Sequence, residues 1–290
     1  MTVTARDGRS LEVLVAPGDG LPLVWHHGTP SAAVPFAPML RAAAASGLRL
    51  VQVSRAGYGT SERRHGRTVV DVVEDTADVL DAIGTETFVT AGWSGGGPHA
   101  LACAARLPGR CLAAATLAGV GPWSAEGLDF LAGMGPENLH EFGLAAEGEE
   151  ALIPFLTEVA ATLAVVAPEE VAAELGGLVA DVDRDSLTGE FAEWTAELFH
   201  RSVVSGIGGW ADDDLAFCAH WGFELEEVRV PVAVWQGGRD LMVPFAHGVW
   251  LASRVPGAEP NLFAEHGHLS LCVGHLEEIF AGLADAARPA

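Results

Sequence analysis

The sequence predicts an α/β fold: a mostly parallel sheet with helices on both faces and an inserted helical cap. Short, almost continuously apolar runs alternate with segments whose apolar residues recur at helical spacing. This alternation is typical of a sheet that helices cover on both sides. Between about residues 121 and 228 only helical patterns occur, and the strand pattern then resumes. The helical stretch is therefore predicted to be an insertion; the alternative is a second, unrelated helical domain.

The predicted core comprises residues 1–120 and 229–290. Residues 2–5 and 11–15 alternate in polarity around Asp7-Gly8, which predicts a hairpin. Apolar runs predict further strands at 21–25, 48–53, 87–91, 111–117, 230–235 and 259–264. Helical spacing predicts helices at 36–46, 69–83, 99–107, 245–254 and 269–287.

The predicted cap, residues 121–228, is strongly acidic. Its only lysine or arginine residues are Arg184 and Arg201. Apolar spacing predicts helices at 152–166, 168–179 and 187–205, and Pro168 suits a first helical turn. The insertion begins after a strand, at the edge of the sheet where α/β proteins place their sites.

The composition limits the classes of partner. The chain has 290 residues, 49% of them hydrophobic, a formal charge of −23 and no lysine. Binding to nucleic acid is not expected, because phosphates require clustered cations. The charge favours neutral or cationic substrates, although we prefer the plainer interpretation that it keeps the protein soluble. We expect a small-molecule substrate, and either a monomer or a homodimer.

The cysteine pattern and the hydropathy indicate neither a metal site nor a membrane segment. The four cysteines include no Cys-x-x-Cys pair and have no zinc-ligand spacing, so no metal is expected. No cofactor is expected either, because the chemistry predicted below needs none. Cys103 and Cys111 are predicted to be small core residues. The chain shows neither a signal-peptide core nor an apolar run of about 18 residues, which predicts a cytoplasmic protein.

The stretch Gly92-Trp93-Ser94-Gly95-Gly96 lies between a predicted strand and a predicted helix. Strand, Gly-x-Ser-x-Gly and helix together predict a nucleophile elbow, with Ser94 on a tight turn at the end of the sheet. The flanking glycines let strand and helix approach closely. The alternative is a glycine-rich turn that only connects the two elements.

A serine hydroxyl needs a base, and the base needs a carboxylate that orients it. Asp240 follows the predicted strand 230–235, and His268 follows the predicted strand 259–264. The order Ser94, Asp240, His268 is the one expected for an elbow nucleophile. His266 is a rival base, but His268 directly precedes the last helix. The alternatives are a solvated turn carboxylate and a polar loop histidine.

An acyl-transfer site also needs donors for an oxyanion. We predict that these are the backbone N–H groups of Gly95 and Thr29, with the Thr29 hydroxyl as a further candidate. Pro30 has no N–H and cannot serve. The alternative for this loop is a simple Gly-Pro turn.

Several other residues have two interpretations. Trp93, next to the nucleophile, and Trp123 and Phe130, in the cap, are candidates for the wall of the substrate pocket, although core packing would explain them as well. His99 is expected to be a structural core histidine. Asp212-Asp213-Asp214 is expected to be a solvated run or a helix cap and not a metal site.

Five segments together resemble the α/β-hydrolase superfamily, in its branch with a serine nucleophile and a helical cap. They are His27-Gly28, Arg55-Ala56-Gly57-Tyr58-Gly59, the elbow, Gly238-Arg239-Asp240 with Val243-Pro244, and Gly267-His268. The resemblance covers nearly the whole chain and implies the α/β-hydrolase fold, with the triad and oxyanion hole at the positions given above. The cap matches only in being helical, so the resemblance does not extend to the substrate.

The resemblance also excludes some activities. Epoxide hydrolases and haloalkane dehalogenases of this superfamily have an aspartate where this chain has Ser94. Proline iminopeptidase-like members usually have a Gly-Gly-Pro-Gly loop, from which Gly28-Thr29-Pro30-Ser31 departs.

The expected function is a serine hydrolase that cleaves small apolar esters, lactones or amides through an acyl-enzyme. The same triad could support carbon–carbon bond hydrolysis or perhydrolysis. An aminopeptidase similar to proline iminopeptidase remains an alternative, because an acidic cap could hold a free α-amine. A binding protein with little turnover is the alternative outside enzymes.

Overall fold

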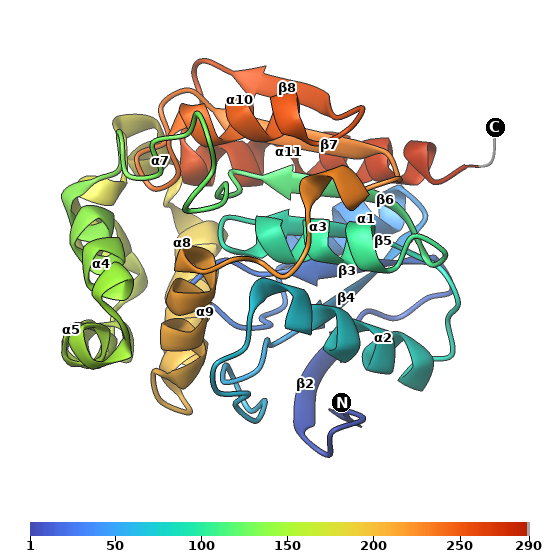
Figure 1. The fold of residues 1–290 in the computed structure, drawn as a ribbon, viewed down its shortest axis with the longest axis horizontal. Helices are drawn as coiled ribbons and strands as arrows, with labels where there is room; N and C mark the ends of the chain where they lie inside the picture. The colour runs from blue at the N-terminus through green and yellow to red at the C-terminus, as the bar shows by residue number, and fades with distance from the viewer. Residues whose placement is uncertain (289–290) are drawn as a thin grey trace.

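The strands of the protein form one sheet, described here from a computed structural model that covers residues 1–288 (Figure 1). In chain order the strands are β1 (Thr2–Thr4), β2 (Ser10–Val15), β3 (Leu21–His26), β4 (Leu48–Val53), β5 (Phe88–Trp93), β6 (Cys111–Leu117), β7 (Val232–Gly237) and β8 (Glu259–Phe263). Their order across the sheet is β1-β2-β4-β3-β5-β6-β7-β8. The hairpin of β1 and β2 joins β4 antiparallel, and all pairs from β4 to β8 are parallel. The predicted, mostly parallel sheet is confirmed.

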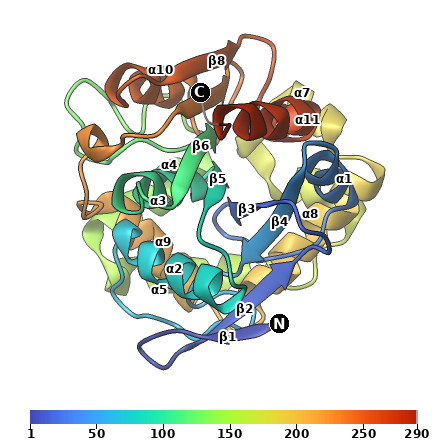
Figure 2. The ribbon, with the colours of Figure 1, turned by 90° about the vertical axis from the view of Figure 1, so that its right-hand side faces the viewer.

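Helices cover both faces of the sheet, because successive strand residues point to opposite sides. In β3, Leu23 and Trp25 belong to one buried cluster and Val24 to the other. The first cluster packs under α1 (Ala37–Ala45) and α11 (His268–Ala286), and the second under α2 (Val72–Ala82), α3 (Gly96–Arg106) and α10 (Phe245–Arg254). The two groups of helices lie on opposite sides of the sheet in Figure 2.

The chain between β6 and β7 is helical, and residues 118–231 contain no strand. Its α-helices are α4 (Pro136–Glu147), α5 (Glu149–Leu163), α6 (Val171–Glu174), α7 (Asp181–Ser186), α8 (Gly189–Val203) and α9 (Gly208–Cys218). We call residues 121–228, which contain these helices, the insertion. Its helices gather at one end of the sheet, on the left in Figure 1.

The predicted elements of the core agree more closely with the structure than those of the insertion. The strands at 48–53 and 111–117 and the helix at 245–254 have the predicted bounds. The helix predicted at 168–179 is instead broken into Pro168–Glu170, Val171–Glu174 and Gly176–Leu178, of which the first and last are 3₁₀ turns. Adjacent glycines at 176 and 177 explain the break, because glycine disfavours a continuous helix. Helices α4, α7 and α9 do not correspond to any predicted helix.

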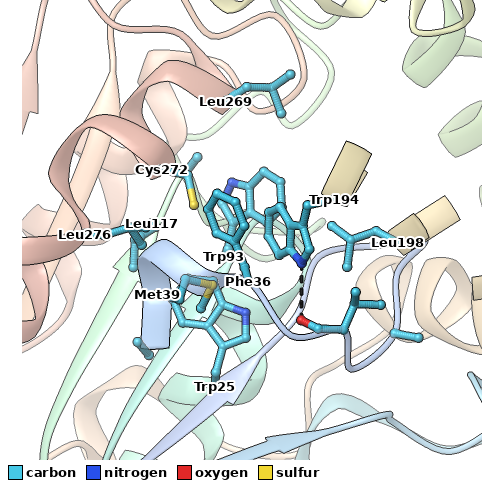
Figure 3. Close-up of a cluster of buried hydrophobic side chains, with 14 of the residues drawn as sticks. Trp25, Phe36, Met39, Trp93, Leu117, Trp194, Leu198, Leu269, Cys272 and Leu276 are labelled. Carbon is cyan, nitrogen blue, oxygen red and sulfur yellow. Dashed lines mark hydrogen bonds between the residues drawn. The ribbon is translucent and has the colours of Figure 1, made fainter. Parts of the chain in front are cut away.

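Aromatic side chains join the insertion to the core. Trp194 of α8 stacks on Phe36 with ring centroids 4.5 Å apart, and on Trp93 at 6.1 Å. Its indole N–H donates a hydrogen bond of 3.1 Å to the Val34 carbonyl oxygen. Figure 3 shows this stack next to side chains of β3, α1 and α11. The contact holds α8 against the end of β5, where Ser94 follows.

The two cysteines that were predicted to be small core residues are buried. Cys103 in α3 and Cys111 at the start of β6 are fully buried, and neither is in a disulfide. Across residues 1–288, no helix combines the length and the apolar character that crossing a membrane requires.

Candidate active site

Ser94 occupies a tight turn between β5 and α3. Its φ is 56°, a left-handed conformation that costs a non-glycine residue about 1–3 kcal/mol and occurs mainly at functional sites. The turn needs glycine on both sides. A Cβ on Gly92 would lie 2.0 Å from the Gly96 carbonyl oxygen, and a Cβ on Gly96 would lie 2.0 Å from the His26 carbonyl oxygen. This is the local geometry of a nucleophile elbow.

Asp240 and His268 form a buried hydrogen-bonded pair. The His268 Nδ1 atom lies 2.8 Å from Asp240 Oδ2, and both residues are almost completely buried. The other carboxylate oxygen, Oδ1, accepts N–H groups from Met242 at 2.9 Å and Val243 at 2.8 Å. When Nδ1–H donates to the carboxylate, Nε2 is left with a lone pair and can accept a proton.

The environment adjusts the basicity of His268. Burial alone lowers the pKa of this imidazole, but the charge of Asp240 and the hydrogen bond to it have the opposite effect and prevail. The pKa of His268 is therefore raised above 6.5. A raised pKa makes the ring a better proton acceptor.

One cavity of about 500 Å³ brings the predicted residues together. Ser94, Gly95, Thr29 and His268 all line it, and Asp240 lies behind His268. Ser94 is partly exposed, as a nucleophile must be. The volume is within the range of small-molecule sites.

The two predicted oxyanion donors are close neighbours. A Cβ on Gly95 would lie 2.4 Å from the Thr29 hydroxyl oxygen. Across residues 1–288, neither the Gly95 nor the Thr29 backbone N–H donates to a protein oxygen, so both remain free for a ligand. The Thr29 hydroxyl is different: it donates to Asp213 Oδ2 at 2.6 Å. Its single proton is engaged, and the expectation that it could serve as a further oxyanion donor is wrong.

Of the three residues predicted to form the wall of the substrate pocket, one lines the cavity and two do not. Trp93 lines the cavity. Trp123 and Phe130 are outside its lining; their rings pack together at 4.9 Å, and Phe130 contacts Phe142 and His247. Phe130 belongs to the core cluster beneath α10 and Trp123 packs against that cluster, so their assignment to the pocket is corrected. The apolar wall comes from other residues of the insertion, including Phe142, Phe155, Leu198, Phe199, Trp210 and Phe217.

The other two histidines considered occupy different surroundings. His266 Nε2 lies 3.2 Å from His275 Nε2, and its ring packs on Phe263. Its partners separate it from Asp240, so His268 and not His266 pairs with the carboxylate. His99 is fully buried, with Nδ1 2.8 Å from the Gly95 carbonyl oxygen, as expected of a core histidine.

Asp213 ties the insertion to the loop that carries Thr29. The residue is completely buried in α9, so the expectation that residues 212–214 form a solvated run is wrong. Its carboxylate forms ion pairs with Arg55 at 2.5 Å and Arg67 at 2.6 Å, and accepts the Tyr58 hydroxyl at 2.9 Å. Burial alone raises the pKa of Asp213, but the two guanidinium groups outweigh it and lower the pKa well below 3.8. The residue therefore stays ionised.

Arg55 connects this ion pair to the oxyanion loop. Its guanidinium donates to the carbonyl oxygens of His27 and Gly28, the latter at 2.9 Å. The same group lies 3.0 Å from the Thr29 hydroxyl oxygen. Arg55 therefore fixes the backbone on which the Thr29 N–H depends.

Asp183 of α7 holds the backbone of His268. Its carboxylate accepts three consecutive N–H groups at the start of α11, from His268 at 2.8 Å and from Leu269 and Ser270 at 2.9 Å each. These N–H groups have no partner within the helix, so the carboxylate acts as its N-cap from another segment. A Cβ on Gly267 would lie 2.3 Å from Asp183 Oδ2, which explains the glycine before the histidine.

The sequence contained little signal for these two supports. The run Asp212-Asp213-Asp214 is unusual inside a helix, and together with Arg55 it could have suggested a buried ion pair. Asp183 is one of many acidic residues in the insertion and has no distinguishing neighbour.

Comparison with known proteins agrees with the fold described above. A family model described as the alpha/beta hydrolase fold matches residues 22–274. The chain belongs to this family. Across 282 residues, 96% of this chain and 98% of the relative, it is 29% identical to a pimeloyl-(acyl-carrier protein) methyl ester esterase of Aromatoleum aromaticum.

Solved structures show the same fold. An alpha/beta hydrolase fold protein from Nakamurella multipartita is 24% identical, with a TM-score of 0.65 and 99% of each chain covered. A thermophilic esterase from Thermogutta terrifontis is 20% identical, with a TM-score of 0.67, and the match covers 98% of this chain and 96% of that one. The family and its relatives support a general hydrolase activity.

Proposed function

We propose that the protein is a serine esterase that hydrolyses small apolar esters through an acyl-enzyme on Ser94. The observation that carries the proposal is the 2.8 Å contact between His268 Nδ1 and Asp240, at the cavity that Ser94 also lines. A hydroxyl, an imidazole and a carboxylate in this relation can activate the hydroxyl at neutral pH.

In the first half of the reaction, the Ser94 hydroxyl oxygen attacks the substrate carbonyl carbon and its proton passes to His268 Nε2. The carbonyl oxygen gains a negative charge, which the N–H groups of Gly95 and Thr29 stabilise. The tetrahedral intermediate then collapses, and the bond to the alcohol oxygen breaks. The alcohol takes the proton from His268, which leaves an ester on Ser94.

In the second half, water replaces the alcohol. His268 removes a proton from the water as it attacks the acyl carbon, and then returns that proton to the Ser94 oxygen as the acid departs. Asp240 keeps Nδ1 protonated throughout and stabilises the imidazolium. The products are a carboxylic acid, an alcohol and the free enzyme.

The insertion serves as the cap of this site. Helices α4, α5, α8 and α9 supply most of the apolar lining, which suits an aliphatic or aromatic acyl chain. The domain boundaries that follow are residues 1–120 and 229–290 for the core and 121–228 for the cap. Excluding water from the cavity would strengthen the hydrogen bonds to the oxyanion.

The test is hydrolysis of short p-nitrophenyl esters by the wild type and by Ser94→Ala. We expect kcat to fall by about 10⁴-fold or more in the variant, because the nucleophile is lost. Ser46→Ala, a serine outside the site, is the matched control and retains wild-type activity. Equal rates for the wild type and Ser94→Ala, with both proteins folded, would reject the proposal.

The pH dependence gives a second readout. Because His268 acts as a base only when neutral, kcat/KM should rise with pH through the raised pKa, above 6.5. An activity that is highest in acid and falls across this range contradicts the role of His268.

A further inference from the structure

Two carboxyl groups of the insertion face the cavity without a basic partner. Glu141 lies on α4 and Asp214 on α9, and both line the cavity with Ser94 and His268. Asp214 is only 1% exposed, yet across residues 1–288 neither of its carboxylate oxygens accepts a hydrogen bond from an N–H or hydroxyl group. A buried carboxylate without a partner is costly, and native proteins rarely keep one without a reason.

The cavity as a whole is negatively charged. Its lining includes four acidic residues, Glu137, Glu141, Glu174 and Asp214, and neither lysine nor arginine. The neighbouring Asp213 is paired with Arg55 and Arg67, and neither arginine lines the cavity. A ligand in this cavity therefore meets a surplus of negative charge.

Glu141 and Asp214 interact with each other. Burial and mutual repulsion raise the pKa of Asp214 well above 3.8, and burial also raises the pKa of Glu141. A proton shared between the two carboxyl groups explains how the pair is tolerated. The Trp210 indole N–H donates to Glu141 Oε1 at 2.7 Å and fixes one of the two groups. The other carboxyl group, on Asp214, has no such donor within residues 1–288.

We propose that Glu141 and Asp214 bind a positively charged group of the substrate, a protonated amine. An ammonium group provides the N–H donors that the Asp214 oxygens lack and the positive charge that the lining lacks. The aromatic rings of Trp210, Phe142 and Phe217, which line the same cavity, suit the alkyl part of such a ligand. The cleaved ester would then carry an amine on the portion that enters the insertion.

A divalent cation fits these residues less well than an amine. Such ions prefer several oxygen ligands and retain water, whereas this cavity is mainly apolar. Within residues 1–288, no group of three or more histidine, cysteine, aspartate or glutamate side chains is arranged to hold a metal ion.

The proposal about substrate class rests on the proposed esterase function, but amine binding can be measured without turnover. Calorimetric titration of the Ser94→Ala protein with hexylammonium and with hexanol compares two ligands of similar size. We expect hexylammonium to bind at least about tenfold more tightly. The preference should disappear in Ser94→Ala combined with Asp214→Asn, and shrink in Ser94→Ala combined with Glu141→Gln.

The matched control is Glu147→Gln, also in the Ser94→Ala background. Glu147 is an exposed acid on α4, the helix that carries Glu141, and its loss should leave the preference unchanged. Unfolding curves establish that each variant is folded. Equal affinity for hexylammonium and hexanol, or an unchanged preference in both the Asp214→Asn and Glu141→Gln variants, overturns the proposal.

A kinetic arm separates this proposal from the esterase proposal. Wild type is assayed with p-nitrophenyl esters of ω-amino acids, each matched with an unsubstituted ester of the same chain length. We expect kcat/KM to favour the amino ester by about tenfold at the best chain length, and Asp214→Asn to abolish that advantage. Amine binding without hydrolysis of any ester would reject the esterase and retain the amine subsite. Hydrolysis with no preference for amino esters would reject the subsite as a determinant of specificity.

Discussion

Two adjacent buried aspartates on α9 have pKa values that are shifted in opposite directions. Asp213 faces the core, where Arg55 and Arg67 hold it, and its pKa is lowered. Asp214 faces the cavity, where Glu141 is its neighbour, and its pKa is raised. Both are at most 1% exposed. Burial is therefore not what distinguishes them; the charges that surround each group are.

The difference separates structural from ligand-binding acids in the insertion. Asp213 and Asp183 have every partner they need within the protein, and they hold the loops of Thr29 and His268 in place. Within residues 1–288, Asp214 accepts no hydrogen bond, and Glu141 accepts only the Trp210 indole N–H and has no basic partner. An insertion with few basic residues can thus both support a catalytic site and leave negative charge available to a substrate.

The Asp213→Asn variant tests the role of the core-facing aspartate. It should lower the free energy of unfolding more than the other variants described here. The variant leaves Arg55 and Arg67 charged and buried without a counter-ion, which typically costs about 3–5 kcal/mol. The free energy of unfolding in urea measures this loss. A change as small as that of Asp214→Asn would remove the distinction between the two residues.

The contributions of Asp213 and Asp214 to the stability of the folded state should depend on pH in opposite directions. The pKa of Asp213 is lowered in the folded state, so its contribution to stability is present above 3.8 and is lost as the pH falls through the lowered pKa. The pKa of Asp214 is raised, so its contribution is complete below 3.8 and is lost as the pH rises through the raised pKa. Unfolding curves of the Asp214→Asn variant should lack this second decline. A wild-type decline that persists unchanged in the variant contradicts the assignment.

Asp183→Ala tests whether a core-facing acid acts on the site itself. Removing the acceptor of three N–H groups should lower stability by about 1–2 kcal/mol and kcat for esters by about 10-fold to 100-fold, because the histidine backbone loses its anchor. Asp183→Asn retains a carbonyl oxygen and should recover most of the kcat. In both variants the rising limb of the pH–rate profile should move to lower pH, because the charge of Asp183 raises the pKa of His268.

The control for this experiment is Asp185→Ala, which removes an exposed acid from the same helix. It should change neither kcat nor the pH profile. A loss of stability in Asp183→Ala with an unmoved pH profile would limit Asp183 to a structural role.

Asp214→Asn should have the smallest effect on stability. Exchanging a repelled carboxyl for an amide of the same shape relieves the unfavourable interaction with Glu141, so the free energy of unfolding should stay within about 1 kcal/mol of the wild type or rise near neutral pH. Urea unfolding near neutral pH measures it. A loss comparable to that of Asp213→Asn would show that Asp214 has a structural partner after all.

The core could be predicted from sequence because its signals are local. The predicted apolar runs 87–91, 230–235 and 259–264 end within two residues of the ends of β5, β7 and β8. The residues that follow such runs must meet at one edge of a parallel sheet. The helix α3 begins where the glycines after Ser94 allow it. No knowledge of distant contacts was needed for these positions.

The insertion could not be predicted in the same way. A helical pattern shows that a helix exists but not which segment it packs against, so Trp123 and Phe130 were assigned to the wrong surface. The run of aspartates looked solvated because its partners, Arg55 and Arg67, lie about 150 residues earlier in the chain. Asp183 caps a helix that begins 85 residues later, and no local sequence pattern indicates such a contact.

The account depends most directly on an activated serine at position 94. Mass spectrometry of the protein after reaction with a fluorophosphonate measures that activation without a substrate. We expect one covalent adduct, located on Ser94, that is absent in Ser94→Ala and forms at least about 100-fold more slowly in His268→Ala. An unmodified Ser94 in folded wild-type protein, or equal labelling rates in wild type and His268→Ala, would contradict the account.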